Sequence, residues 1–336
     1  MRKLIACFVA ILLISTVRPA AAFEGQFATS DRLMEWVDTY RNSPRPFLMP
    51  DAARAMRRLG LLRDQEKASF FTGFIAGVLG DNPKQAKALV EQLFPMPAKE
   101  QAVIIKAIAY SGLPKWQGIL REFAPRMPHR KALVDEYLKG EAKPLMEVPL
   151  ETGPEVLYAL WGYYIATGYY VPVVRVIEAL RWAEVRNQER PTWFARAKSA
   201  FSWSKGPDIS LMTIGATAKW TLASYAERDR ELLAFYRSQL EMQPDEIKPV
   251  LEETIAAGET FDADRIRVEE LEVVEDAKRR EMIADGRPSR ATTAGSVALA
   301  TGCVIATASG LPEIGLPCII TGALYNGAVK MWQSGE

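Results

Sequence analysis

The sequence predicts an all-α protein, an irregular α-solenoid of antiparallel helix pairs with a C-terminal apolar helical hairpin. Three observations predict this class. Apolar residues recur at helical spacing from about residue 30 to residue 257. Alternating runs of β-branched residues, which are typical of strands, are nearly missing over the same range. Short turns of Gly, Pro and Asp separate the helical segments, and helices joined in this way pack as antiparallel neighbours.

The N-terminus has the pattern of a secretory signal peptide. A basic head, Met1 to Lys3, precedes an uncharged apolar run over residues 4–17, which is shorter than the about 20 residues that span a bilayer. Small residues then predict cleavage between Ala22 and Phe23. An uncleaved anchor is the alternative. We expect an exported protein whose residues 1–22 are removed.

Composition limits the function of the exported part. The chain is 49% hydrophobic and 25% charged, as in a packed globular protein. Residues 1–22 carry three cations and no acid, so their removal changes the formal net charge from +1 to −2. This balance gives no electrostatic reason to expect nucleic acid as a partner.

An N-terminal helical set is predicted over residues 23–140. Thr29 to Asp31 is a typical helix start, and a second helix is expected from Asp51 to Leu62. From Phe70 the sequence predicts two helices joined by a turn at residues 80–83. Residues 98–111 and 113–124 form the next predicted pair.

A linker with three prolines is predicted over residues 141–154, and an aromatic-rich helical set over residues 155–260. In this second set Gly162 and Pro172 each lie 89 positions after Gly73 and Pro83. Matching turn residues around apolar helices indicate a repeated helix-turn-helix unit. Residues 208–227 and 230–241 form a further predicted pair.

The segment from Leu160 to Leu180 resembles a tetratricopeptide repeat. Trp161 and Gly162 lie early in its first helix, and Gly168 and Tyr170 lie at its turn. As a whole, the pattern is similar to exported helical-repeat proteins of Gram-negative bacteria that have no assigned activity. The resemblance implies a helix-pair architecture and a periplasmic location, and it implies no catalytic residue.

Residues 261–290 are predicted to form a charged helix and a loop. The helix, over residues 262–285, has only a thin apolar stripe, which is typical of a solvated helix. Residues 291–332 then form an apolar, small-residue segment, in which two arms meet near Glu313. The segment predicts either membrane association, with attachment to the inner membrane, or a hairpin docked on the body.

Cys303 and Cys318 are the two cysteines that remain after removal of residues 1–22. A turn near Glu313 would offset their α-carbons by roughly 7 Å along the two arms, from the helical rise alone. This offset disfavours a disulfide between them.

Catalytic and metal-binding patterns are missing from the sequence. His129 is the single histidine, so neither a two-histidine metal site nor a Cys/His cluster can form. Ser202 and Lys205 match the spacing of a serine nucleophile and its lysine, but the companion motifs of such enzymes are absent. We therefore predict no catalytic residue, no metal and no cofactor, and a non-enzymatic protein.

Aromatic residues are dense between Tyr158 and Tyr225, and they give the candidate binding residues. Neighbouring rings on a helix point in different directions, so one member of each tyrosine pair is expected to face solvent or a groove. The candidate binding residues are Tyr163, Tyr164, Tyr169, Tyr170, Trp193 and Phe194. The sequence favours a binding or scaffold protein that contacts another envelope protein or a peptide.

The alternative is an envelope enzyme that acts on polysaccharide in an aromatic-lined cleft. Glu155, Glu178 or Glu184 would then serve as its acids.

Overall fold

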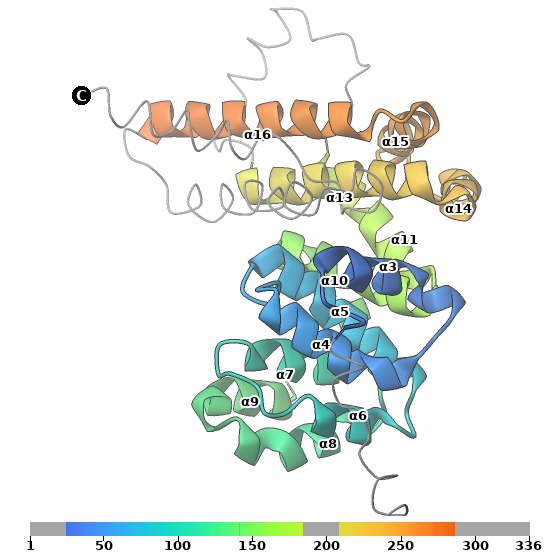
Figure 1. Cartoon of the computed structure of the whole chain (residues 1–336). Coiled ribbons are helices and arrows are strands. Elements are labelled where there is room, and N and C mark those ends of the chain that lie inside the picture. Colours follow the sequence, from blue (N-terminus) through green and yellow to red (C-terminus); the bar gives the residue numbers. More distant parts are fainter. Residues whose placement is uncertain (1–24, 141, 184–207, 286–336) are drawn as a thin grey trace, which may run out of the picture.

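The computed structural model describes residues 25–140, 142–183 and 208–285. These residues form thirteen α-helices and contain no strand (Figure 1). The predicted all-α class is therefore confirmed for the described part of the chain.

The helices fall into two successive groups along the chain. The first group comprises α3 (Ser30–Thr39), α4 (Met49–Arg58), α5 (Gln65–Asp81), α6 (Ala86–Gln92), α7 (Gln101–Tyr110), α8 (Trp116–Phe123) and α9 (Lys131–Leu138). The second group comprises α10 (Pro154–Thr167), α11 (Val171–Glu178), α13 (Ile209–Arg228), α14 (Arg230–Leu240), α15 (Lys248–Thr260) and α16 (Ala263–Asp285). The short 3-10 helices between them are η1 (Tyr40–Asn42), η2 (Pro46–Leu48), η3 (Ala124–Arg126), η4 (Pro128–Arg130), η5 (Leu145–Glu147), η6 (Leu150–Thr152) and η7 (Ala179–Trp182).

Side-chain caps fix several helix starts. Thr29 accepts a hydrogen bond of 3.4 Å from the backbone N–H of Arg32, so α3 begins where the sequence predicts. Asp64 accepts one of 3.0 Å from Lys67, and α5 consequently begins at Gln65, five residues before the predicted start at Phe70. Because the first turn of α5 is polar, the spacing of apolar residues does not show that the helix starts there.

Helices α5 and α10 form the centre of the fold, and they run in the same direction. A Cβ atom added to Gly73 would lie 1.8 Å from the carbonyl oxygen of Ala159, and one added to Gly162 would lie 1.9 Å from that of Phe70. The two contacts are reciprocal, because each glycine meets the residue three positions before the other glycine. The repeated glycines therefore allow the two backbones to touch, at a spacing that no larger residue permits.

The predicted linker packs against the core. Over residues 142–153 the chain makes the two turns η5 and η6, and it buries Leu145, Val148 and Leu150. Arg175 of α11 donates hydrogen bonds to the carbonyl oxygens of Met146 and Val148, the latter at 3.0 Å. A single cluster of buried apolar side chains extends from Phe27 to Ile255 and includes this segment.

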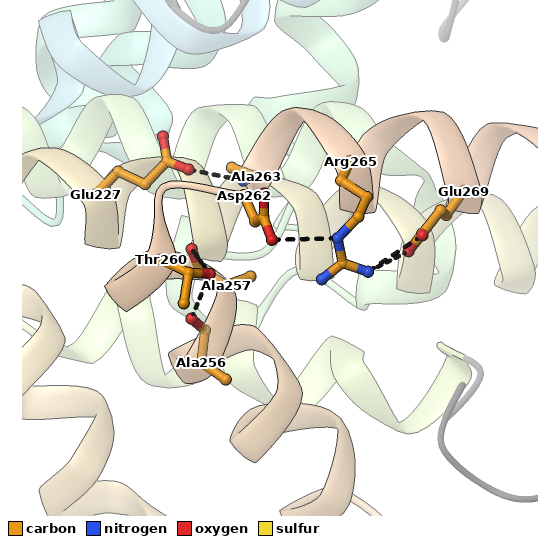
Figure 2. A network of polar contacts seen from close by, with 8 residues as sticks. All are labelled: Glu227, Ala256, Ala257, Thr260, Asp262, Ala263, Arg265 and Glu269. Carbon is orange, nitrogen blue, oxygen red and sulfur yellow. Dashed lines mark hydrogen bonds and ion pairs between the residues drawn. The ribbon is translucent and has the colours of Figure 1, made fainter.

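Helix α16 lies along α13 in antiparallel orientation, as Figure 1 shows at the top of the molecule. Figure 2 shows how the corner between α15 and α16 is fixed. Glu227, near the end of α13, accepts a hydrogen bond of 2.7 Å from the backbone N–H of Ala263. Arg265 contacts Asp262 at 3.3 Å and Glu269 at 3.1 Å. Polar contacts thus set the point at which α16 begins.

None of the helices in the described ranges is long and apolar enough to cross a membrane. Residues 291–332, for which a hairpin or membrane segment is predicted, lie outside the described residues, as do Cys303 and Cys318. The predicted signal peptide and its cleavage site at Ala22 and Phe23 also lie outside them. The hairpin or membrane segment, the signal peptide and its cleavage site remain predictions.

Candidate functional site

The junction between α10 and α11 holds four of the candidate binding residues, Tyr163, Tyr164, Tyr169 and Tyr170. We call residues 163–171 the tyrosine turn. Gly168 ends α10 in the left-handed conformation, with φ of 72°, and its N–H bonds to the carbonyl oxygen of Tyr164 at 2.7 Å. Pro172 lies in the first turn of α11, where its missing N–H is tolerated. The sequence thus places this turn by local backbone chemistry alone.

In each tyrosine pair one ring is less buried than the other, but Tyr169 alone of the four is exposed to solvent. Tyr164 is buried, whereas Tyr163 is half-buried against the core. Tyr169 is 56% exposed, whereas Tyr170 is half-buried and stacks on Phe235 of α14, with ring centres 4.1 Å apart. The outer edge of the turn therefore presents Tyr169 and its neighbour Val171, which is also exposed.

A polar contact beneath the turn ties three distant parts of the chain together. Arg41 of η1 donates hydrogen bonds to the hydroxyl of Tyr164 and to the carboxylate of Asp229. The Tyr164 hydroxyl also donates to Asp229, at 3.3 Å. The Arg41 guanidinium lies over the Tyr164 ring, 5.1 Å from its centre. These contacts hold α10 against η1 and the α13–α14 corner.

Asp229 serves two structural purposes at this corner. It caps α14 by accepting hydrogen bonds of 3.0 Å from the backbone N–H groups of Glu231 and Leu232. Burial would raise the pKa of Asp229, but the hydrogen bonds from Arg41 and from these two N–H groups outweigh it, so the pKa is lowered. Asp229 is therefore ionised at neutral pH and holds Arg41 in place.

The outer edge of the turn also carries a carboxylate. Asp81, the last residue of α5, raises the pKa of the Tyr169 hydroxyl through its negative charge. Burial raises the pKa of Asp81, and a hydrogen bond with Tyr169 opposes this rise. Asp81 thus lies near the exposed Tyr169 hydroxyl. An exposed aromatic ring beside an exposed aliphatic side chain can bind an apolar group of a partner.

The large tryptophans of the region are buried. Trp161 stacks on Tyr225, with ring centres 4.1 Å apart, and Trp220 lies beneath the guanidinium of Arg267, whose Cζ is 4.5 Å from the ring centre. Both rings serve the packing of the core, because large aromatic side chains gain much from burial.

None of the other candidate residues that the structure describes lies at the tyrosine turn. Trp193, Phe194 and Glu184 lie outside the described residues. Glu178 forms an ion pair of 3.5 Å with Arg175, its neighbour one turn earlier on α11. Glu155 lies in the first turn of α10, at the opposite end of that helix from the tyrosine turn.

No metal site is formed by the described residues, which contain no group of three or more His, Cys, Asp or Glu side chains placed to hold an ion. The single histidine, His129, is exposed in the 3-10 helix η4 before α9.

Sequence reasoning missed Arg41, Asp81, Asp229 and Phe235. Asp229 had a signal, because an aspartate directly before a predicted helix is a typical N-cap. The other three had none, because only the packing of α5, α14 and η1 against α10 brings them to the turn.

The chain matches no protein-family model, no curated protein and no solved structure.

Proposed function

We propose that this protein is an exported, non-enzymatic binding or scaffold protein of the cell envelope, and that the tyrosine turn contacts a partner protein or peptide. The observation that carries the proposal is the exposed pair of Tyr169 and Val171 on a turn anchored from below by Arg41, Tyr164 and Asp229. Aromatic residues held rigidly at a surface contribute strongly to binding, because little conformational entropy is lost when a partner arrives.

The helix pairs support an α-solenoid arrangement for this scaffold. The unit of α5 and α6 shares its glycine and proline spacing with the unit of α10 and α11, and the two glycines face each other's helix. Stacked helix pairs present extended surfaces that suit protein recognition.

A photocrosslinking phenylalanine analogue tests the proposed surface in the native cells. Placed at position 169, it should form a covalent adduct with a defined envelope protein. Placed at position 47, it should not, although Phe47 is comparably exposed at 62% and lies in η2, outside the tyrosine turn. Equal adducts at both positions, or none at position 169, would count against the proposal.

Alanine variants separate binding from folding at the turn. Tyr169→Ala should abolish capture of the crosslinked partner and leave the melting temperature within a few degrees of the original, because most of the ring is exposed. Tyr170→Ala removes the stacking on Phe235 and should lower the melting temperature as well. If Tyr169→Ala unfolds the protein, Tyr169 is part of the core and the surface assignment is wrong.

We propose further that residues 291–332 hold the protein at the inner membrane. Support comes from their apolar, small-residue composition alone. After a carbonate wash, the full-length chain should stay with the membrane and a chain ending at Asp285 should be released. Identical soluble behaviour of both would leave the docked hairpin as the explanation.

A further inference from the structure

Charge is distributed unevenly between two parts of the chain. Residues 99–131, which include α7 and α8, contain seven Lys and Arg residues and two acids, so their formal charge is +5. Residues 241–259, which include the turn after α14 and most of α15, contain six acids and one lysine, so their formal charge is −5. We call these two stretches the basic end and the acidic end. The formal charge of +1 for the whole chain conceals both of them.

The two stretches lie on opposite sides of the folded core. Helix α8 lies at the bottom of the molecule in Figure 1, whereas α14 and α15 lie near the top. Helices α5 and α10, which form the centre of the fold, lie between them. Because the packed core holds the two stretches apart, the basic end of one copy does not reach the acidic end of the same copy.

The acids of the basic end do not neutralise its cations. Glu100 pairs with Arg63 at 3.5 Å, and Glu122 pairs with Lys87 at 2.8 Å. Both of these cations lie outside the basic end. Three exposed cations within it have no ion pair among the described residues, and they are Lys99, Lys115 and Arg121.

The acidic end has the complementary arrangement. Its one lysine, Lys248, pairs with Asp245 at 3.2 Å, and Glu253 pairs with Lys219 of α13 at 3.0 Å. Three exposed acids have no ion pair among the described residues, and they are Glu241, Glu246 and Glu252. Each end therefore carries three exposed charges for which the described part of the same copy supplies no counter-ion.

Apolar side chains accompany the charges at both ends. Trp116 and Ile119 lie three residues apart, on one face of α8, and both are only half-buried. Met242, in the turn after α14, is 65% exposed. A contact between the two ends would therefore pair charges and cover apolar surface together, as protein interfaces do.

We propose that the basic end of one copy docks on the acidic end of a second copy, so that the chains join head to tail. Opposite charges attract the two surfaces, whereas like charges disfavour contact between two basic ends or two acidic ends. Because the two surfaces differ, each contact leaves one basic end and one acidic end free, and the assembly can grow beyond a dimer. The tyrosine turn belongs to neither end, so this contact is independent of the partner proposed for the turn.

A second copy fits these surfaces better than an anionic lipid surface does. Lipid phosphates would neutralise the basic end alone and would leave the acidic end and Met242 uncovered. A second copy covers both ends and brings them at equal concentration. If the chain stays monomeric and binds vesicles of anionic lipid through the basic end, the basic end belongs to a membrane surface and the proposal is overturned.

Sedimentation velocity of the full-length chain, kept in one non-ionic detergent throughout, measures the association and its salt dependence. Raising the salt from about 50 mM to about 500 mM shortens the Debye length from roughly 14 Å to roughly 4 Å, so the association constant should fall on the order of 10-fold or more. Association through the apolar residues 291–332 would not weaken, because salt does not screen apolar contacts. A monomer at every salt concentration, or an association that salt does not weaken, would overturn the proposal.

Charge reversal locates the two surfaces. Changing Lys99, Lys115 and Arg121 to Glu takes the basic end from +5 to −1, and changing Glu241, Glu246 and Glu252 to Lys takes the acidic end from −5 to +1. Both ends of each triple variant then have the same sign, so its self-association should weaken on the order of 100-fold.

A matched control changes the same amount of charge elsewhere. Arg32, Arg45 and Arg279 are exposed and lie outside both ends. Their joint change to Glu alters the net charge as much as reversal of the basic end does, and it should leave self-association within about threefold of the original. Equal loss of association in this control and in the reversed basic end would mean that net charge alone is responsible, and it would overturn the proposal.

A mixture of the two reversed variants decides whether the ends bind each other. One variant supplies an unchanged acidic end and the other an unchanged basic end, so association in an equimolar mixture should return to within about tenfold of the original. Recovery on mixing also shows that the variants are folded, because unfolded chains could not restore the contact. Variants that keep the original circular dichroism and stay monomeric when mixed would overturn the proposal.

Discussion

Alanine in place of Gly162 tests the contact on which the centre of the fold depends. The added Cβ would lie 1.9 Å from the carbonyl oxygen of Phe70, whereas real Cβ atoms essentially never come closer than 3.0 Å. Helices α5 and α10 must therefore separate by about 1.1 Å. Overpacking of this kind costs about 1–3 kcal/mol, and a backbone obstacle places the cost at the upper end. Better helix propensity of alanine offsets about 1 kcal/mol of it. We expect a net loss of about 2 kcal/mol.

Gly118 supplies the matched control within the same chain. It lies in α8, it is exposed, and nothing comes within 4 Å of its added Cβ. Gly118→Ala should therefore stabilise the protein by about 0.5–1 kcal/mol. Urea unfolding followed by far-ultraviolet circular dichroism measures both variants, which should differ by about 3 kcal/mol. If Gly162→Ala is as stable as Gly118→Ala, the helices do not touch through their glycines and the reasoning is refuted.

Three further predictions concern single sites. Phe261 has φ of 58°, a backbone conformation that is strained for a residue other than glycine, and it is 66% exposed. Phe261→Gly should therefore raise stability by about 0.5–1 kcal/mol in thermal melting. A lower melting temperature of the variant would show that the backbone at Phe261 is not strained. Asp229→Ala should lose about 2 kcal/mol at pH 7, because it removes both the cap of α14 and the partner of Arg41. The pKa of Asp229 is lowered in the folded state. Its contribution to stability is therefore present above the ordinary aspartate pKa of about 3.9 and is lost as the pH falls through the folded-state pKa. The difference in unfolding free energy between the original protein and Asp229→Ala should consequently become smaller in acid. The pH dependence that Glu66 gives to stability has the opposite sign, because its pKa is raised to about 8 in the folded state. The folded state keeps a proton that the unfolded state loses above about pH 4, so the free energy of unfolding falls as the pH rises towards 8. In urea unfolding, the free energy of unfolding of Glu66→Gln should exceed that of the original protein by on the order of 3 kcal/mol at pH 8 and should equal it near pH 4. A difference that stays the same at both pH values would exclude Glu66 as the titrating group.

Local backbone chemistry is what the sequence by itself determined. Apolar spacing predicted the helices, and Thr29, Gly168 and Pro172 marked a helix start, a helix end and a turn through interactions with residues at most a few positions away. The spacing of Gly73 and Gly162 also predicted a repeated unit. The helix start, the helix end and the turn were predictable because their causes lie within one or two turns of helix, whereas the contact that the two glycines make joins distant helices.

Long-range packing is what only the tertiary structure decided. The charged helix α16 looked solvated in sequence, yet it buries Arg267 and Glu270 against α13, because partners such as Lys219 lie 51 positions away from Glu270 in the chain. The contact of Arg41 with Asp229 spans 188 positions and had no local signal. A charged side chain is stable in the interior only beside its partner, and a sequence does not reveal that partner until the helices are packed.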